Sequence, residues 1–194
     1  MNLETIAKQA RELDAKSGPS KGLPPVHLWH PPFCGNIDMR IAGDGSWHYM
    51  GTPISRPAMV RLFSTILRRD PERYVLVTPV EMVGITVDDA PFVAVEMLVE
   101  KNSEGVILNF RTNVDVWIAA SEIHPIRFDM EATGGLKPYV LVRTGLWAKV
   151  SRAVYYEMIG LATTKETDGA VMLGLESHGA FFPMAPASDF DGLM

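Results

Sequence analysis

The segment Ile54–Phe63, "ISRPAMVRLF", decides how the chain is divided, because a similar segment follows ninety-six positions later. The second segment is Val150–Ile159, "VSRAVYYEMI". Each begins with a β-branched residue and a Ser-Arg pair and continues as an amphipathic run, which predicts the start of a helix. After loops of equal length, an apolar run follows in both places, "YVLV" from Tyr74 and "AVML" from Ala170. This ungapped register predicts an internal duplication and two related modules.

The two predicted helices also have apolar faces in the same phase. The face of the first helix consists of Met59, Leu62, Phe63 and Ile66, which fall on Tyr155, Met158, Ile159 and Ala162 of the second. Such a stripe marks the side of a helix that packs on a core. We therefore expect Phe63 and Ile159 to be buried at equivalent positions.

The domain organisation that follows is an α+β fold with an N-terminal module at residues 1–84 and a C-terminal module at 85–194. The elements expected in the first module are a helix at 1–16, a linker at 17–27, strands, and a helix at 55–68. The elements expected in the second are strands about ten residues apart, a helix at 151–163 and a loose tail at 185–194. The regular spacing of short strands is typical of a small barrel or sandwich.

Composition restricts the classes of function. The chain has 194 residues, of which 47% are hydrophobic, and a net charge of −5. Affinity for nucleic acid polymers comes largely from neutralising phosphates, so this charge argues against such a partner. No apolar run approaches the roughly 20 residues of a membrane span. The sequence lacks a signal-peptide pattern and has a single cysteine, Cys34, so we expect a cytoplasmic protein.

Sequence motifs for catalysis are missing. There is no phosphate-binding loop, no nucleophile elbow and no H-E-x-x-H metal motif, so we lean against an enzyme and expect no cofactor. His27, His30 and Cys34 lie close together in "HLWHPPFC", which permits a zinc or thiol site. A second pair of ligands is not nearby, and the segment is rich in proline. We therefore favour a packing segment in which Cys34 is a small buried hydrophobe, and we expect no metal.

Arg56 and Arg152 are the most informative candidate site residues. Each is expected in the first turn of a helix, where the helix dipole disfavours a cation by about 0.3–1 kcal/mol. An anion near each arginine would offset this cost. One alternative is an internal carboxylate, with Asp38, Asp44 or Asp115 as candidates. The other is a bound phosphate or carboxylate, which the free backbone N–H groups of a helix start would also favour.

Four further residues complete the candidate ligand-binding set. Trp47 and Trp147 could stack on a base, although an aromatic residue near a helix start is more often part of the core. Arg143 and Asp38 are the other two. A groove between the modules is the expected location, because ligand sites favour domain interfaces.

The chain resembles a known bacterial family. The motifs are "WHPPFCGNIDMRIAGDGSWHYMGTPISRPAMVRLFSTILRRD", "YVLVTPVE", "DDAPFVAVEM" and "PYVLVRTGLWAKVSRAVYYEM". In this order they are similar to the uncharacterised family called domain of unknown function 1285, from about Trp29 to about Ala162. The resemblance implies a duplicated α+β core whose C-terminal half is superficially like a pleckstrin-homology-type barrel with a packed helix. It also implies a site at the domain interface for a nucleotide-like ligand and a role in signalling.

Three kinds of function stay open. The first is a non-enzymatic regulatory protein that binds a small anionic ligand, for which a nucleotide is one candidate. The second is an enzyme of unrecognised type that uses the same groove. The third is a protein-binding module, for which a flat apolar patch would be the structural sign.

Overall fold

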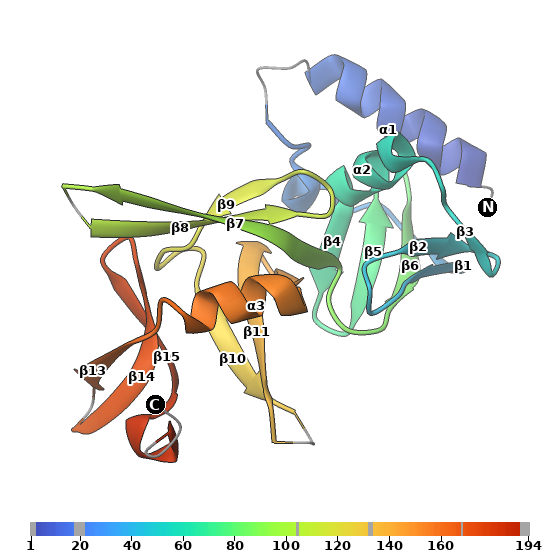
Figure 1. Ribbon diagram of the computed structural model, residues 1–194. Coiled ribbons are helices and arrows are strands. Elements are labelled where there is room, and N and C mark those ends of the chain that lie inside the picture. Colours follow the sequence, from blue (N-terminus) through green and yellow to red (C-terminus); the bar gives the residue numbers. More distant parts are fainter. Residues whose placement is uncertain (1–2, 18–21, 104, 132–133, 168, 191–194) are drawn as a thin grey trace. The chain divides into compact units, whose positions relative to one another are not determined.

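The computed structural model describes residues 3–17, 22–103, 105–131, 134–167 and 169–190, and this part of the chain is mostly β with three α-helices (Figure 1). The chain forms two compact units. The N-terminal unit extends to Pro91 and includes Thr144–Leu146, and the C-terminal unit contains Phe92–Arg143 and the chain from Trp147 onward. The division comes later than residue 84 because strand β6 (Met82–Val87) belongs to the N-terminal sheet.

The N-terminal unit contains a six-stranded sheet with the order β3-β2-β1-β6-β5-β4. Its other strands are β1 (Phe33–Ile41), β2 (Trp47–Tyr49), β3 (Thr52–Pro53), β4 (Leu67–Asp70) and β5 (Arg73–Val77). Strands β1–β3 and β4–β6 are antiparallel meanders, and the parallel pairing of β1 with β6 joins them. The helical elements are α1 (Leu3–Ser17), the 3-10 helix η1 (Val26–Leu28) and α2 (Pro57–Thr65).

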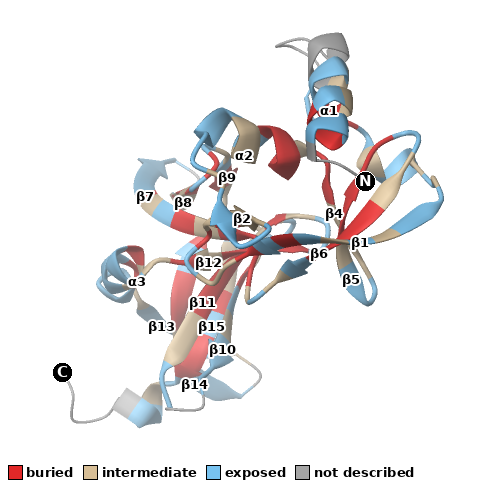
Figure 2. Cartoon of the chain, turned by 90° about the vertical axis from the view of Figure 1, so that its right-hand side faces the viewer, coloured by how far each residue is buried: buried red, intermediate tan, exposed pale blue. Residues whose placement is uncertain are grey.

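Helix α2 connects the two meanders and presents its apolar face to the core. Leu62 and Phe63 are buried, as the periodicity predicts, and the Phe63 ring stacks on Trp47 with 6.3 Å between centroids. Helix α1 packs on α2, and its residues Ile6 and Ala10 are buried. Figure 2 shows exposed residues on the outer surface of α1 and buried residues along the strands beneath the helices. The predicted first helix is confirmed for the described residues, from Leu3 onward.

Helix α2 ends at Thr65, earlier than the expected residue 68, and "LRRD" forms strand β4. The hydroxyls of Ser64 and Thr65 donate hydrogen bonds to the carbonyls of Arg61 and Leu62, three residues back. These bonds satisfy carbonyls at the helix end. Leu67 is then fully buried in the sheet opposite Leu76, so tertiary packing overrides the helical pattern.

Arg68 fastens the segment before β1 to the sheet. Its Nη1 donates to the carbonyl oxygens of Val26 at 2.9 Å and Trp29 at 2.7 Å. Its Nε donates to Asp70 at 2.7 Å, and the side chain is only 16% exposed. The arginine therefore supplies donors to a connector that has few backbone partners of its own.

The C-terminal unit contains a six-stranded and a three-stranded sheet, with the orders β10-β11-β12-β7-β8-β9 and β13-β14-β15. The strands of the larger sheet are β7 (Phe92–Asn102), β8 (Gly105–Thr112), β9 (Trp117–Ala119), β10 (Ile126–Met130), β11 (Leu136–Arg143) and β12 (Leu146–Val150). After α3 (Arg152–Ile159) come β13 (Thr163–Thr167), β14 (Ala170–Ser177), β15 (Ala180–Pro186) and the 3-10 helix η2 (Ala187–Phe190). The prediction of a loose tail is therefore wrong for residues 185–190, and 191–194 lie outside the described residues.

Helix α3 differs from the prediction in length and in its buried face. It ends at Ile159 instead of residue 163, because β13 begins at Thr163 and pairs with β14. Val154 and Met158, four residues apart, are buried where α3 packs on β7. Ile159 is 43% exposed, so the predicted equivalence with Phe63 is wrong.

The two six-stranded sheets have the same strand order when each is followed from the third strand of its unit. The N-terminal order is β3-β2-β1-β6-β5-β4, and the C-terminal order becomes β9-β8-β7-β12-β11-β10. In both, the first and sixth strands pair in parallel at the centre. The helices occupy different places, since α2 follows the third strand and α3 follows the sixth.

Ser177 links the two sheets of the C-terminal unit. Its hydroxyl accepts a hydrogen bond from the Leu108 N–H at 2.9 Å and donates one to the Ala120 carbonyl at 2.7 Å. The Ala120 N–H also donates to the Leu108 carbonyl. The Ser177 side chain is completely buried, so it replaces a backbone partner at the end of the β8–β9 ladder.

Phe63→Ala is expected to lower the free energy of unfolding by about 3–5 kcal/mol, because it removes a fully buried ring and leaves a cavity beside Trp47. A denaturant titration measures this. Val80→Ala, at a side chain 63% exposed, serves as the control and should cost little. A loss below about 1 kcal/mol for Phe63→Ala would contradict the assignment of the core.

Ser177→Ala is expected to cost about 1–3 kcal/mol, since it leaves a buried N–H and a buried carbonyl without the hydroxyl that satisfies both. Ser188→Ala removes an exposed hydroxyl and is the matched control. Equal unfolding free energies for the two variants would show that Ser177 does not link the sheets.

Candidate functional site

Two concave surfaces, one in each unit, are candidate binding sites. The arginine groove in the N-terminal unit has a volume of about 540 Å³, and the β9 pocket in the C-terminal unit has about 600 Å³. Both volumes lie in the range of small-molecule sites.

The arginine groove lies where α1 meets α2, and its lining extends from the start of α2 to its last residue. Its lining residues are Arg11, Arg56, Pro57, Ala58, Met59, Arg61, Leu62 and Thr65. The three arginines come from two helices and from the residue before α2, and the lining contains no acidic residue. Three like charges at one groove create a positive potential that attracts anions.

Arg56 lies at the start of α2, as predicted, but as its N-cap residue, with Pro57 as the first helical residue. Its side chain is exposed, and within the described residues it has no hydrogen bond or ion pair. The predicted internal carboxylate is therefore not its partner. Asp44 instead accepts hydrogen bonds from Ser46, and Asp115 accepts one from Arg111.

Arg152 is the first residue of α3, and a contact with Tyr156 holds its positive charge away from the positive end of the helix dipole. Its Nη2 donates to the Tyr156 hydroxyl at 3.0 Å, one turn along the helix, and its guanidinium lies over the Tyr156 ring. The side chain therefore extends away from the helix start. Ser151 caps the helix by accepting from the Val154 N–H. No carboxylate in the described residues pairs with Arg152.

The other predicted site residues lie in different surroundings. Trp47 is 1% exposed and stacks on Phe63, so it is a core residue and not a stacking surface for a base. Trp147 is half-buried in β12, with the Arg127 guanidinium 4.2 Å from its ring centroid. Arg143 lies over the Phe92 ring, and burial lowers its pKa to about 10. Asp38 is an exposed residue of β1. The structure brings none of these four to the lining of the arginine groove.

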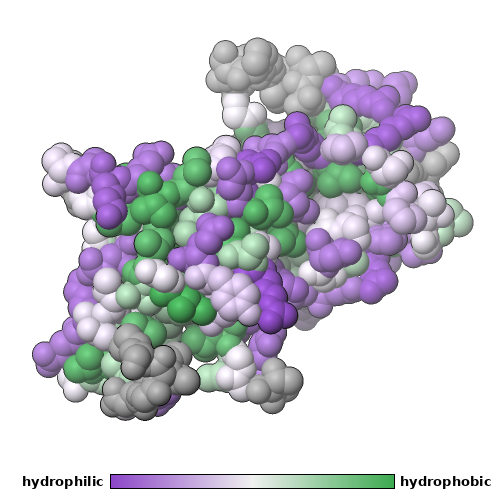
Figure 3. Space-filling model, in the orientation of Figure 1, coloured by the Kyte–Doolittle hydropathy of each residue, from purple (hydrophilic) through white to green (hydrophobic). Residues whose placement is uncertain are grey.

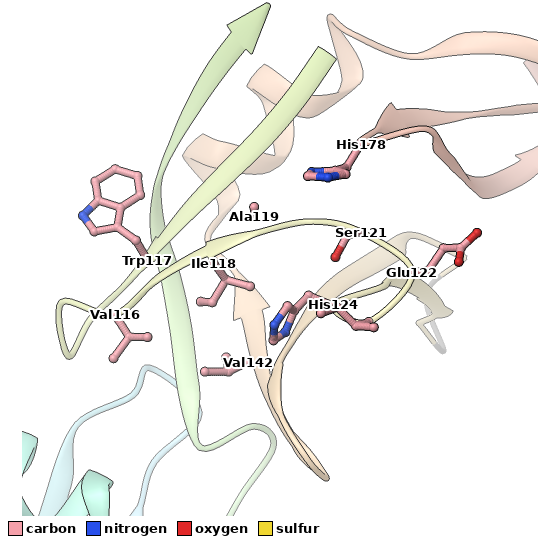
Figure 4. A pocket seen from close by; sticks show the side chains of 10 residues that line it. Val116, Trp117, Ile118, Ala119, Ser121, Glu122, His124, Val142 and His178 are labelled. Carbon is pink, nitrogen blue, oxygen red and sulfur yellow. The ribbon is translucent and has the colours of Figure 1, made fainter. Parts of the chain in front are cut away.

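The β9 pocket combines apolar and polar side chains. Its lining consists of Val116, Trp117, Ile118, Ala119, Ser121, Glu122, Ile123, His124, Val142 and His178. Figure 4 shows Ile118, Val142 and His124 close together, with Trp117 on the other side of β9. The His124 Nδ1 lies 2.9 Å from the Leu141 carbonyl oxygen, which can only accept, so Nδ1 carries the proton. In the neutral ring Nε2 is then an acceptor.

The residues of the β9 pocket form no sequence motif, so no local pattern predicts the pocket. Glu122 and His124 are near each other in the chain, but His178 comes from the turn between β14 and β15. A backbone signal existed at His178, which has a positive φ of 51° and precedes Gly179. That signal indicates a tight turn and gives no indication of a pocket.

The "HLWHPPFC" segment differs from its prediction. Cys34 is exposed, so its interpretation as a buried hydrophobe is wrong, and its thiol lies 3.5 Å from the Pro32 carbonyl. His27 and His30 are also exposed. Among the described residues, no three of His, Cys, Asp and Glu gather where they could hold a metal ion. In the same part of the chain, none of the helices combines the length and apolar character needed to span a membrane.

Comparisons with known proteins give the family. The family description "Domain of unknown function (DUF1285), N-terminal domain" matches residues 24–90, and "Protein of unknown function (DUF1285), C-terminal domain" matches 91–184. A solved DUF1285 family protein from Silicibacter pomeroyi DSS-3 is 49% identical, with a TM-score of 0.82 over 96% of this chain and 97% of that chain. Another, from Shewanella baltica OS155, is 29% identical, with a TM-score of 0.50 over 64% of this chain and 91% of that chain.

A comparison with curated proteins finds no match. The division between the family's two domains, after residue 90, agrees with the end of the N-terminal unit at Pro91. The resemblance based on the ordered motifs is confirmed: the chain belongs to the DUF1285 family.

Proposed function

We propose that this protein is a non-catalytic regulator that binds a small anionic ligand in the arginine groove. The observation that carries the proposal is the set of three arginines, Arg11, Arg56 and Arg61, around one groove without an acidic lining residue. An anion there would accept charge-assisted hydrogen bonds from guanidinium groups.

Arg56 is the residue expected to contribute most. It is exposed and has no carboxylate partner in the described residues, so its guanidinium does not have to leave an ion pair to bind a ligand. Its position at the start of α2 also places an anion near the positive end of the helix. Guanidinium groups bind phosphates through paired hydrogen bonds, which favours phosphorylated metabolites and nucleotides as the ligand class.

The regulatory part of the proposal rests on the chemistry of the groove lining. Arginine, threonine and apolar side chains can hold and orient an anion, but none of them is a common general acid or base. A protein that binds such a ligand without converting it would act by responding to the ligand. We therefore propose signal transduction as the role. Catalysis by an unrecognised mechanism is the alternative.

We also propose that the two six-stranded sheets arose by internal duplication. The shared strand order and the central parallel pair in each sheet support this. In this duplication β1 corresponds to β7, and each following strand of the first sheet corresponds to the next strand of the second. The similar helix segments at Ile54 and Val150 then do not correspond to each other, because they follow different strands. A likeness of the C-terminal unit to pleckstrin-homology-type barrels is part of the same proposal, supported by the helix that follows its sixth strand.

A thermal-shift screen against inorganic phosphate, nucleotides and phosphorylated sugars tests the ligand proposal. At a hundred times its dissociation constant, a bound ligand should add about 2.7 kcal/mol of stability and raise Tm by several degrees. Arg56→Ala should reduce this shift strongly, because it removes one of the three cations. Arg73→Ala, which also removes one exposed positive charge, is the matched control and should leave the shift unchanged.

An unchanged shift in Arg56→Ala would remove the arginine groove as the site. The absence of a shift with every phosphate compound would contradict the ligand class. Added salt should weaken binding to this exposed groove, since mobile ions screen its charges.

A further inference from the structure

We propose that the outer edge of β9 is a docking site at which an extended peptide of a partner protein adds to the C-terminal sheet as a further strand. This site is separate from the arginine groove, and the proposal does not depend on the ligand described above.

The hydrogen-bond pattern leaves the backbone of β9 available on one side. Strand β9 is the last strand of its sheet and pairs only with β8 among the described residues. The Ala120 N–H donates to the Leu108 carbonyl, and the Thr112 N–H donates to the Val116 carbonyl. In an antiparallel pair these bonds recur at every second residue. The N–H and carbonyl groups of Trp117 and Ala119 therefore point away from β8.

The β9 pocket lies along this edge. Val116, Trp117, Ile118 and Ala119 are consecutive, and their side chains alternate between the two faces of the sheet. All four residues line the pocket, so it runs along the length of the strand. Figure 4 shows Ile118 on the same side of the strand as Val142 and His124, and Trp117 on the other side. Trp117 and Ala119, whose backbone groups point away from β8, belong to this lining, and an extended peptide matches the spacing of these groups.

The flanks of the pocket indicate the side chains of the peptide. Trp117 is 46% exposed and Ile123 is 76% exposed, and large apolar side chains at such exposure often mark protein contacts. On the face drawn in Figure 3, hydrophobic side chains gather over the C-terminal unit. Glu122 is the only Asp, Glu, Lys or Arg in the lining. A peptide with alternating apolar residues and one basic residue fits these flanks.

The edge is held in place before any peptide binds. Ser177 fixes the end of the β8–β9 ladder through Leu108 and Ala120. Beyond it, Ser121 and His124 exchange two backbone hydrogen bonds, and the His124 ring is anchored to Leu141. Since the strand is already ordered, a peptide would not have to order it on binding.

The experiment selects binders from a display library of random linear peptides against the full chain and synthesises those selected. Hydrogen exchange followed by NMR then compares the chain with and without a selected peptide. The Trp117 and Ala119 amides should become protected, while the Ile118 and Ala120 amides, which face β8, should change little. Peptides whose methylated backbone nitrogens face β9 should lose binding. Peptides methylated on the alternate nitrogens, which face away from β9, should keep it.

Ala119→Pro removes one outward N–H and should weaken a selected peptide roughly tenfold. Proline is tolerated where the N–H of an edge strand faces away from its neighbour. Hydrogen exchange of the Ile118 and Ala120 amides in Ala119→Pro without peptide checks that β9 still pairs with β8. Val80→Ala, at an exposed side chain of the N-terminal unit, is the control and should retain affinity. An unchanged affinity in Ala119→Pro, binding without protection of the Trp117 and Ala119 amides, or the absence of any selected peptide with a Kd below about 100 μM would overturn the proposal.

Discussion

The parallel pairing of the first strand with the sixth is the constraint on which each six-stranded sheet depends. It joins residues about fifty positions apart, such as Phe33 with Met82 and Phe92 with Ala148, whereas the other pairings follow short turns. In the N-terminal sheet the Asn36 side chain of β1 lies directly over Gly84 of β6, where a Cβ would overlap the Asn36 Oδ1. A larger residue at this position would displace the Asn36 side chain beside the central strand pair.

Local patterns in the sequence predict local structure well and long-range structure poorly. The first helix, the hairpin around Gly43 and the alternating strands after Pro91 follow from periodicity and turn residues. Both internal helices end early, because residues after Thr65 and Ile159 gain strand partners that are distant in sequence. No periodicity of single segments encodes those partners. The two Ser-Arg segments begin helices at different places in their units, since α2 follows the third strand and α3 follows the sixth.

The candidate sites also differ in how far the local sequence predicts them. Arg56 could be found because a cation at a helix start is unfavourable on its own, and that argument needs only local sequence. The rest of the arginine groove depends on the packing of α1 on α2, and the β9 pocket depends on the end of a strand ladder. The sequence of β9 contains no charged residue or proline of the kind that often marks an edge strand, so its position at the edge could not be predicted. The two proposed sites, one for a charged ligand and one for a peptide backbone, thus lie in different units of the same chain.

Arg68 also has a consequence for how α1 is tethered. By holding the carbonyls of Val26 and Trp29 against β4, it fixes the connector close to the sheet. Only residues 18–25 separate α1 from Val26 in the sequence, so anchoring Val26 raises the effective concentration of α1 at α2. Loss of the anchor would lengthen this connection and lower that concentration. Arg68 would therefore support the packing of α1, and with it the position of Arg11, from strand β4.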